Sequence, residues 1–514
     1  MELTEDNKEE NIDTEFKERL KVLFVTTELT PLAKAGGLGD FSGSLPKVLA
    51  KDYHLEIKIV MPKYKFLDTQ KYPVEPITHD IKFRMQNFKF KKTKVFKTFL
   101  PKTIIPIYLL DLPDLFNGDS IYNHTAQGRE PILNYIYFSQ IALELMRSMD
   151  WQPDIIHLQD WMMGMIPKWL KTFKKDNFFQ RTGTVLTIHN IKYQGDLEYK
   201  KARMFGLRKK DFYETFKINR KKEINILGEA ILNSDAVNTV SLTYARELLT
   251  KKYSRGLQKI LQSRNKNFTG ILNGIDYSYF DPRTNEDTPV KYWIDSLDKK
   301  VENKLFLQKK FGLTQSPDLP LICVVSRLSS QKGLDLIEDV LKDLIDMGAQ
   351  FVILGSGLDK IEKIFIKAEK KYPKAIEAEM EFNANLAQTI YAGADMLLMP
   401  SRFEPCGLSQ IIAMRFGTIP IVRKTGGLAD TVRDGYTGFV FKHYDKNAFL
   451  WAIRRAVDLY YNGKKQWRKM QINAMKKDFS WKASAKKYIW LYKKAIRNHK
   501  EWLKEQEKEN AVKT

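Results

Sequence analysis

The chain has 514 residues, 43% of them hydrophobic and 12% aromatic, so it can bury more than one core and is not a disordered polymer. Its 85 lysines and arginines against 62 acidic residues give a formal charge of +23, but the excess lies in scattered patches such as Lys89–Lys97 and predicts a solvated surface, not nucleic-acid binding. Two cysteines without a CxxC pair argue against a disulfide framework or a cysteine zinc site and favour a reducing, cytoplasmic location.

The first half of the chain reads as a parallel α/β sheet preceded by a short leader. Residues 1–17 are polar and acidic, which predicts a disordered leader and not a secretory signal. No apolar run approaches the roughly 20 residues of a membrane span, so no membrane partner is expected. Short β-branched runs then alternate with helical stretches. The expected strands are Leu20–Thr26, Leu55–Met61, Asp154–Leu158 and Thr184–Ile188, and the expected helix is Glu130–Met149.

The second half repeats this pattern after a break. Asn273–Asp298 is rich in turn-forming and polar residues, so we expect the interdomain linker there. The tail from Trp481 to about Glu505 has apolar residues on one face and lysines opposite, which predicts one long helix. The expected strands are Leu321–Val325, Gln350–Leu354, Asp395–Met399 and Thr418–Val422, with helices after Gly333, Pro405 and Gly427.

Two glycine loops echo each other in the two halves. Lys34–Asp40 reads KAGGLGD and Lys424–Asp430 reads KTGGLAD. Each is expected between a strand and a helix, where backbone N–H groups and the helix dipole can hold an anion. Either loop alone is better explained as a tight turn, but the pair indicates a ligand between two similar domains. Neither is a dinucleotide fingerprint or a Walker loop, which disfavours a dehydrogenase or an ATPase.

Charged residues follow two strands of the second half. Arg327 and Lys332 lie five residues apart after Leu321–Val325 and could clamp a diphosphate without a metal, although solvated loop cations are as good an explanation of the pair. Glu404 could face sugar hydroxyls, but a helix-capping acid explains its spacing better. Cys406 has no histidine nearby in the sequence and is interpreted as a small packing residue.

Two polar residues end strands of the first half in the same way. Asp160 and His189 could each bond a sugar hydroxyl, since the carboxyl ends of parallel strands line the ligand crevice. A single histidine at a strand end is more often structural, so these residues gain weight only as part of a set.

Taken together, these segments resemble the family of bacterial glycogen synthases and plant starch synthases, from about Lys21 to Tyr492. The most specific stretch is Pro400–Val432, with PSRFEPCGLSQ and RKTGGLADTV. KAGGLGD, TIHNIKYQG, ILNGID, VSRLSSQKGLDL and DFSWKASAKKY occur in the order typical of the family. The resemblance implies a GT-B architecture, in which two Rossmann-like, doubly wound α/β domains face a deep cleft. The expected units are an acceptor-side domain over residues 18–280, a nucleotide-sugar-binding domain over 281–480, and a helix over 481–510 that packs back on the first domain.

The resemblance also implies an activity and a site. The reaction would be transfer of glucose from ADP-glucose to the non-reducing 4-hydroxyl of an α-1,4-glucan such as glycogen or starch, with retention of configuration and without metal or cofactor. Arg327 and Lys332 would stabilise the leaving diphosphate, Glu404 would hold the glucose, and His189 and Asp160 would lie beside the donor sugar. The remaining donor-binding residues would be Lys34, Gly36, Gly37, Asn273, Phe382, Cys406, Gly407 and Leu408.

Two departures from the family pattern bear on the site. The segment Gln159–Met162 reads QDWM where the family has HDWH, which removes two histidines from the expected polar contacts. A second glutamate, found eight positions after the first in related transferases, is Ile412 here.

Several alternatives stay open at this point. UDP-glucose could replace ADP-glucose as donor, and a catalytically silent glucan-binding homologue would keep the fold without the reaction. A nucleic-acid binder has only the net charge in its favour. Glycogen phosphorylase shares the architecture but needs pyridoxal bound to a lysine, and the motifs found are those of the synthases. The sequence predicts no oligomeric state.

Overall fold

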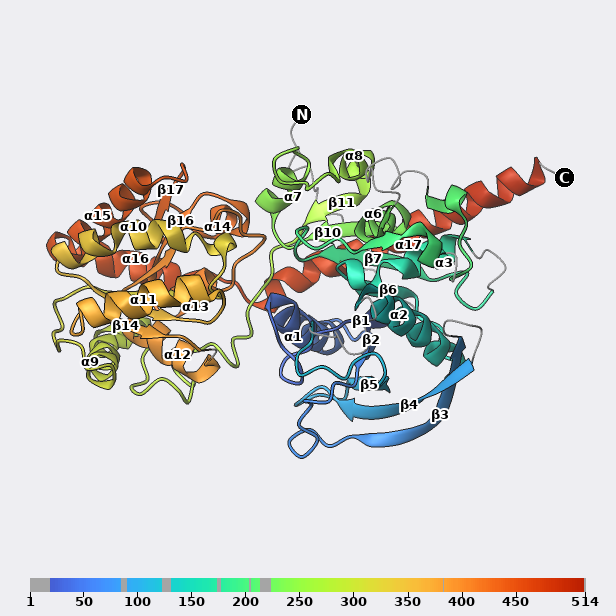
Figure 1. The fold of residues 1–514 in the computed structure, drawn as a ribbon, viewed down its shortest axis with the longest axis horizontal. Helices are drawn as coiled ribbons and strands as arrows, with labels where there is room; N and C mark the ends of the chain where they lie inside the picture. Colours follow the sequence, from blue (N-terminus) through green and yellow to red (C-terminus); the bar gives the residue numbers. More distant parts are fainter. Residues whose placement is uncertain are drawn as a thin grey trace.

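The computed structural model describes residues 19–84, 90–122, 131–172, 177–202, 205–212, 223–381 and 383–512, and the expected leader lies outside these ranges. The described chain forms two lobes, each with its own sheet and hydrophobic core (Figure 1). No helix in the described ranges is both long and apolar enough to cross a membrane.

The first lobe is built on a nine-stranded sheet in the order β11-β10-β7-β6-β1-β2-β5-β4-β3. The strands from β11 to β5 are parallel, and β4 and β3 form an antiparallel hairpin at one edge. The strands are β1 (Lys21–Val25), β2 (Glu56–Pro62), β3 (Glu75–Arg84), β4 (Phe90–Phe99), β5 (Pro106–Asp111), β6 (Ile155–Gln159), β7 (Gly183–Ile188), β10 (Ala236–Thr239) and β11 (Phe268–Gly270). A separate two-stranded sheet pairs β8 (Asp196–Glu198) with β9 (Glu223–Asn225).

Helices cover this sheet on both faces, which is why its central strands are buried along almost their whole length. They are α1 (Gly37–Asp52), α2 (Pro131–Ser148), α3 (Met165–Thr172), α4 (Tyr199–Ala202), α6 (Ile226–Asn233), α7 (Leu242–Leu248) and α8 (Gln258–Ser263).

The second lobe is a six-stranded, fully parallel sheet in the order β14-β13-β12-β15-β16-β17. Its strands are β12 (Leu321–Val325), β13 (Gln350–Leu354), β14 (Ile376–Glu379), β15 (Met396–Met399), β16 (Ile419–Arg423) and β17 (Phe439–Phe441). Its helices are α9 (Lys300–Lys310), α10 (Leu334–Asp346), α11 (Asp359–Lys371), α12 (Ala384–Gly393), α13 (Ser409–Arg415), α14 (Gly426–Thr431), α15 (Lys446–Asn462) and α16 (Lys464–Lys476).

Both sheets reverse their strand order at one point. In the first lobe the chain moves outward from β1 through β2, and then returns to the other side of β1 with β6. In the second lobe the reversal falls between β12 and β15. Ligands of doubly wound sheets bind outside the carboxyl ends of the strands at such a reversal, because the two loops there diverge and leave a crevice.

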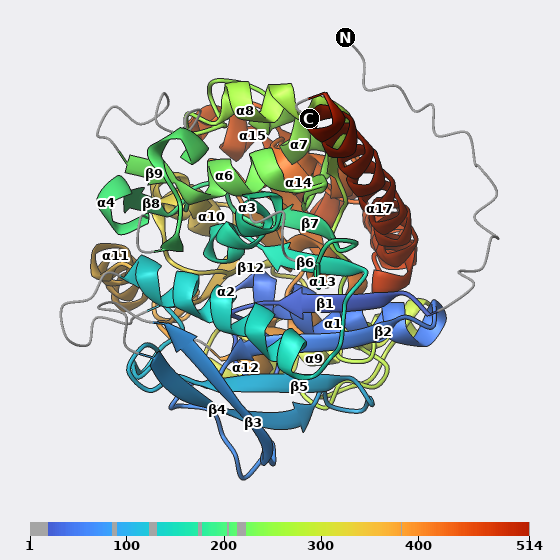
Figure 2. The same ribbon diagram turned by 90° about the vertical axis from the view of Figure 1, so that its right-hand side faces the viewer.

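The chain crosses between the lobes twice, and the two crossings lie side by side. Ile275 N donates to Phe479 O at 2.8 Å, and Ile275 pairs with Ser480 in an isolated parallel bridge. After the second crossing, α17 (Trp481–Ala511) runs back along the first-lobe sheet (Figures 1 and 2). Tyr492 OH lies 2.8 Å from His157 Nδ1, and Asn238 Nδ2 donates to Tyr488 OH at 3.1 Å, so this helix completes the first core.

The eight strands and the long helices expected from the pattern are confirmed, with strand bounds shifted by about one residue. The β3–β4 hairpin was not expected. Its second strand contains the lysine patch that resembled an ordinary charged surface. Exposed Lys92 and Lys94 alternate there with buried Thr93 and Val95, so the period is that of a strand with one solvated face.

Candidate active site

A cavity of about 510 Å³ lies between the lobes, at the strand-order reversals of both sheets. Residues of both lobes line it, together with Asn273 from the first crossing. It brings together expected site residues that are far apart in the sequence: Gly36, Gly37, Asp160, His189, Asn273, Arg327, Lys332, Glu404, Cys406, Gly407 and Leu408. Lys34 is not among its lining residues, and Phe382 lies outside the described residues.

The second-lobe wall carries an ion pair and a further cation. Lys332 Nζ donates to Glu404 Oε2 at 2.6 Å, and Ser401 Oγ donates to the same oxygen at 3.1 Å. Both side chains of the pair are largely buried, at 15% and 6% exposure, so their attraction is weakly screened. Arg327 is exposed to the cavity and has no ion-pair partner within the described part of the chain. The arrangement leaves a guanidinium and an ammonium available to an incoming diphosphate.

Local backbone geometry fixes Lys332 beside Glu404. Lys332 ends a short 3₁₀ turn, and Gly333 follows in the left-handed region at φ 70°. A Cβ on Gly333 would lie 2.1 Å from Pro400 O, so only glycine lets the loop after β12 pack against the loop after β15. Arg402 N donates to Gln331 O at 2.8 Å and joins the same two loops.

The second glycine loop has a different role from the expected one. Gly426 and Gly427 pack beneath the loop Glu404–Cys406, where added Cβ atoms would lie 1.8 Å from Glu404 O and 2.1 Å from Cys406 O. Neither glycine lines the cavity. The expectation that both loops hold the ligand is therefore wrong for this one, because its glycines allow close packing of backbone against backbone.

The first glycine loop does face the cavity, and Glu28 holds it there. Glu28 Oε2 accepts hydrogen bonds from Ala35 N at 2.8 Å and Gly36 N at 2.7 Å, and Tyr122 OH donates to its other oxygen. Glu28 is 3% exposed and lines the cavity. Glu28 was not expected from the sequence, although it lies three residues after β1, much as Asp160 lies directly after β6, and that position was the available signal.

Lys34 lies at the entrance of the same loop. Its Nζ donates to Asp40 Oδ1 at 2.7 Å, and the two side chains are 30% and 20% exposed. The pair closes the loop Lys34–Asp40 onto the first turn of α1. Reaching the cavity would require Lys34 to change its rotamer and leave Asp40.

Asp160 and His189 meet at the first-lobe wall. Asp160 Oδ1 accepts from His189 N at 2.7 Å and from Asn190 N at 3.3 Å. Burial raises the pKa of Asp160 to about 7, while these two backbone hydrogen bonds oppose the rise. Burial lowers the pKa of His189 to about 3, so its ring is neutral near pH 7. The wall therefore offers a carboxyl group that titrates near neutrality beside an uncharged imidazole.

Gln159, one of the two departures from the family pattern, contacts His189. Gln159 Oε1 lies 2.9 Å from His189 Nε2, so an amide contacts the imidazole in place of the family's histidine. Met162, the other departure, lines the cavity and makes this part of the wall less polar.

Asn273 and Cys406 form the floor between the two walls. Asn273 is 4% exposed, and its Oδ1 has no hydrogen-bond partner among the described residues. An unpaired buried acceptor at the cavity is a ready partner for a ligand hydroxyl. Burial raises the pKa of the Cys406 thiol to about 12, so it is not a thiolate near pH 7 and is unsuited to nucleophilic attack.

A set of hydrogen bonds from α7 to the second lobe holds the cavity closed on one side. Thr243 N donates to Asp430 Oδ2 at 2.9 Å, and Thr243 Oγ1 donates to Asp430 Oδ1. Glu247 Oε1 accepts from Thr425 Oγ1 at 2.9 Å and from Gly426 N at 3.1 Å. We call these four residues with Gly426 the latch. It joins α7 of the first lobe to α14 of the second (Figure 1).

No group of three or more His, Cys, Asp or Glu side chains in the described ranges is arranged to hold a metal ion. Arg327 and Lys332 are the side chains that bring positive charge to the lining of this cavity.

Comparison with known proteins gives matches along most of the chain. The family described as starch synthase catalytic domain matches residues 21–263, and glycosyl transferases group 1 matches residues 307–477. Glycogen synthase of Thermosipho melanesiensis is 43% identical over 93% of this chain and 99% of its own length. Glycogen synthase of Thermotoga maritima is 40% identical over 93% and 99%.

Solved structures give the same result for the fold. The catalytic domain of starch synthase IV from Arabidopsis thaliana, bound to ADP and acarbose, has a TM-score of 0.87 at 31% identity. The match covers 93% of this chain and 100% of that domain. Sucrose-phosphate synthase from Thermosynechococcus elongatus has a TM-score of 0.58 at 16% identity, a likeness of fold alone. The expected GT-B architecture is confirmed.

Proposed function

The chain belongs to the family of glycogen and starch synthases and is a glucosyltransferase, and we propose that its donor is ADP-glucose and its acceptor the non-reducing 4-hydroxyl of an α-1,4-glucan. The observation that carries the proposal is the second-lobe wall, where Arg327 and the Lys332–Glu404 pair face the first glycine loop across the cavity. ADP in the Arabidopsis relative supports adenine as the base.

Different residues around the cavity would bind different parts of the donor. Arg327 and Lys332 would bind the distal phosphate, Glu404 would accept from hydroxyls of the glucose, and the backbone at Gly37 and at Gly407 would approach the diphosphate. Asn273 Oδ1 would accept a sugar hydroxyl. Lys34 and Phe382 stay predictions for the donor site, as does the division of the chain into units 18–280, 281–480 and 481–510.

The acceptor would enter along the first-lobe wall. Tyr122, Trp161 and Tyr193 line the cavity there and offer aromatic faces to sugar rings. Asp160 and the neutral His189 would orient the reacting sugars through hydrogen bonds.

The reaction would proceed on one face of the donor. The bond from the anomeric carbon to the phosphate oxygen breaks as the acceptor O4 bonds to the same carbon and face, and the O4 proton passes to the leaving phosphate oxygen. Arg327 and Lys332 lower the barrier because they stabilise the negative charge that develops on that phosphate. The attraction is strong where the closed lobes exclude water.

The test is nucleoside diphosphate release with glycogen as acceptor, with ADP-glucose and UDP-glucose compared side by side. Glucan-dependent release from ADP-glucose is expected. Release from UDP-glucose alone would overturn the donor assignment and keep the transferase. Release from neither sugar nucleotide, in a folded protein that still binds glycogen, would indicate a silent glucan-binding protein.

We also propose that the protein acts in the cytoplasm. Both cysteines, Cys323 and Cys406, are buried free thiols, which is compatible with a reducing compartment.

A further inference from the structure

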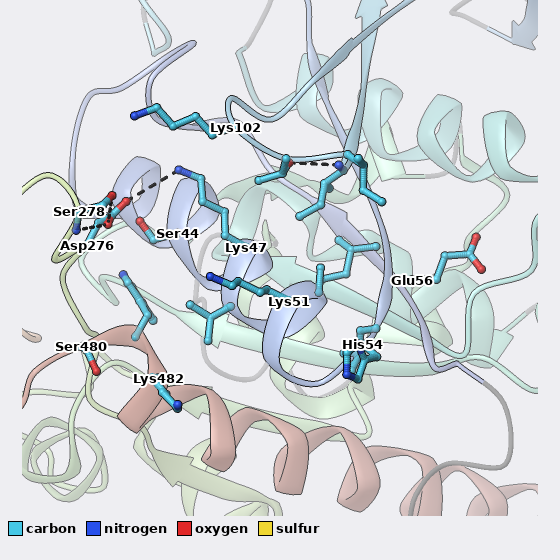
Figure 3. Close-up of a pocket in the computed structure, with 18 of the residues that line it drawn as sticks. Ser44, Lys47, Lys51, His54, Glu56, Lys102, Asp276, Ser278, Ser480 and Lys482 are labelled. Atoms are coloured by element: carbon cyan, nitrogen blue, oxygen red, sulfur yellow. Dashed lines mark hydrogen bonds and ion pairs between the residues drawn. The ribbon is translucent and has the colours of Figure 1, made fainter.

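A second cavity, of about 680 Å³, lies where the chain crosses between the lobes. Its wall is formed by the second half of α1, the turn before β5, both crossings and the first turn of α17 (Figure 3). It shares no lining residue with the catalytic cavity. We call it the hinge pocket.

The hinge pocket is strongly cationic. Six lysine and arginine residues line it against two carboxylates; the cations are Arg19, Lys47, Lys51, Lys58, Lys102 and Lys482. Figure 3 shows Lys47 and Lys51 extending from α1 toward the crossing that carries Asp276, with Lys102 and Lys482 on other sides of the same space.

The two carboxylates neutralise only part of this charge. Glu56 Oε1 accepts from Trp151 Nε1 at 2.6 Å. Asp276 Oδ1 accepts from Ser278 N and Oγ, and its Oδ2 lies 3.8 Å from Lys47 Nζ. In the part of the chain that the structure describes, the ammonium groups of Lys51, Lys102 and Lys482 have no hydrogen-bond or ion-pair partner. Like charges around a cavity repel one another, and an anion in the cavity would remove that repulsion.

The backbone at two of the basic residues is also unusual. His54 and Lys102 have φ values of 56° and 63°, a region that favours glycine or asparagine. Both side chains belong to the lining of the hinge pocket. Basic residues at positions where a smaller residue would relieve strain agree with a role for their side chains in this cavity.

Hydroxyl and apolar groups complete the wall. Ser44, Ser278 and Ser480 lie around the lysines, and Ile104 is 90% exposed at the rim. Lysine binds phosphate as a compact point charge. The hydroxyl and apolar groups are suited to contact the rest of such a ligand, if that part has the size of a sugar. The volume falls in the ordinary range for small-molecule sites, roughly 300–1,000 Å³.

We propose that the hinge pocket binds a small phosphate-bearing metabolite, with its phosphate beside one or more of the unpaired ammonium groups of Lys51, Lys102 and Lys482. An uncharged glucan would leave these cations unpaired and is disfavoured for that reason.

The position of the pocket connects its occupancy to movement of the lobes. It contacts both crossings, through Asp276 and Ser480, and these are the segments about which the lobes must rotate. The same helix α1 reaches from Gly37 in the catalytic cavity to Lys51 in the hinge pocket, a span of about 21 Å at the rise of an α-helix. A ligand that prefers one angle between the lobes will shift their equilibrium by its difference in affinity for the two states.

The test is calorimetric titration of the full chain with inorganic phosphate and with ribose 5-phosphate, and unphosphorylated ribose is the neutral comparison. The titrations are run with saturating ADP, which occupies the diphosphate clamp of the catalytic cavity, and are repeated without ADP, because ADP also bears phosphate and could occupy the hinge pocket. Saturable binding is expected for ribose 5-phosphate. Equal affinity for inorganic phosphate would assign recognition to the phosphate alone, and weaker affinity would show that the sugar contributes.

The double variant Lys51→Glu, Lys102→Glu is expected to weaken this binding about tenfold or more. The matched control is Lys465→Glu, Lys469→Glu on the exposed face of α16, which makes the same change in net charge. Lys482→Ala is a milder variant that should also weaken binding, and retained glucosyl transfer shows that each variant is folded.

Three results would overturn the proposal. They are the absence of saturable binding by both phosphates, an equal loss of binding in the control pair, and unchanged binding in the Lys51→Glu, Lys102→Glu variant. This test measures binding and not turnover. A negative result would therefore overturn the hinge-pocket proposal without bearing on the proposed donor.

Discussion

At the scale of single residues, Asp160 is the side chain of the cleft that changes charge nearest to neutral pH. Its carboxyl is buried at the end of β6, and burial raises its pKa to about 7 from an ordinary 3.8. Below that pH it is protonated and can donate to a sugar oxygen, whereas above it the carboxylate accepts from a sugar hydroxyl. His189 beside it stays neutral over the same range, because burial lowers its pKa to about 3.

The first prediction concerns pH. If the carboxylate form of Asp160 orients the sugar, kcat/KM for ADP-glucose should rise as pH increases through about 7. Asp160→Asn should lower kcat/KM and remove this acidic limb, as a pH–rate profile of both proteins would reveal. An unchanged limb in the variant would assign the titration to another group.

The titration of Asp160 should also affect stability, but here the free energy of unfolding should fall as pH rises. Between pH 3.8 and about 7 the folded state holds the Asp160 proton that the unfolded state has lost. The free energy of unfolding contributed by this group therefore falls as pH rises across that window and is constant above it. Urea unfolding at several pH values should show a smaller decline for Asp160→Asn than for the unaltered chain.

The second prediction concerns the diphosphate clamp. Lys332→Ala should lower kcat about a hundredfold or more, since it removes a charge that stabilises the leaving phosphate and leaves Glu404 unpaired. Lys424→Ala is the matched control, because Lys424 is an exposed lysine of the glycine loop that does not line the cavity. Near-normal turnover in a folded Lys332→Ala protein would exclude the proposed role.

At the scale of elements, strand ends decide where chemistry is possible. The carboxyl ends of β1 and β6 carry Glu28 and Asp160, and those of β12 and β15 carry Arg327 and Glu404. Buried strands can be recognised in the sequence as short apolar runs, so Asp160, Arg327 and Glu404 could be singled out from the sequence, whereas Glu28 was not.

What the sequence could not provide are contacts between distant segments. Glu28 acts on Ala35 and Gly36 through hydrogen bonds that no periodicity reveals. The second glycine loop has the same letters as the first, but its neighbours are Glu404 O and Cys406 O, so identical motifs serve different purposes. The hinge pocket combines five separate segments, and none of them is distinctive by itself.

The third prediction tests Glu28 as a positioning residue. Glu28→Ala removes the acceptor for two backbone N–H groups, which costs about 1–3 kcal/mol for each one left unsatisfied, so the first glycine loop should lose its fixed conformation. The KM for ADP-glucose should rise about tenfold or more with a smaller change in kcat. Glu28→Gln retains an acceptor oxygen and should restore most of the affinity. If the two variants have the same KM, Glu28 does not act through these hydrogen bonds.

At the scale of the whole molecule, the latch and the paired crossings define how the lobes move. The crossings lie together on one side, and Thr243, Glu247 and Asp430 join the lobes through α7 and α14. Rotation about the crossings would have to break these hydrogen bonds. The lobes also approach each other across the cleft, where a Cβ added at Gly37 would lie 3.6 Å from Leu408 Cδ1.

The fourth prediction tests the latch. Asp430→Ala should favour the open arrangement, which small-angle X-ray scattering would detect as a larger radius of gyration, and should raise the KM for the donor several-fold. Asp434→Ala is the control, because Asp434 bonds only within the second lobe, to Val440 N and Arg455. Indistinguishable scattering from the two variants would show that the latch does not hold the lobes together.

The return of α17 to the first lobe has a consequence for how the protein is made. The chain leaves the ribosome from its N-terminus, yet the face of the first sheet that carries His157 and Asn238 is completed by Tyr488 and Tyr492. The whole second lobe must therefore be synthesised before the first can close its core. During translation the lobe that begins first finishes last, with an apolar surface open to chaperones or to premature association until α17 emerges.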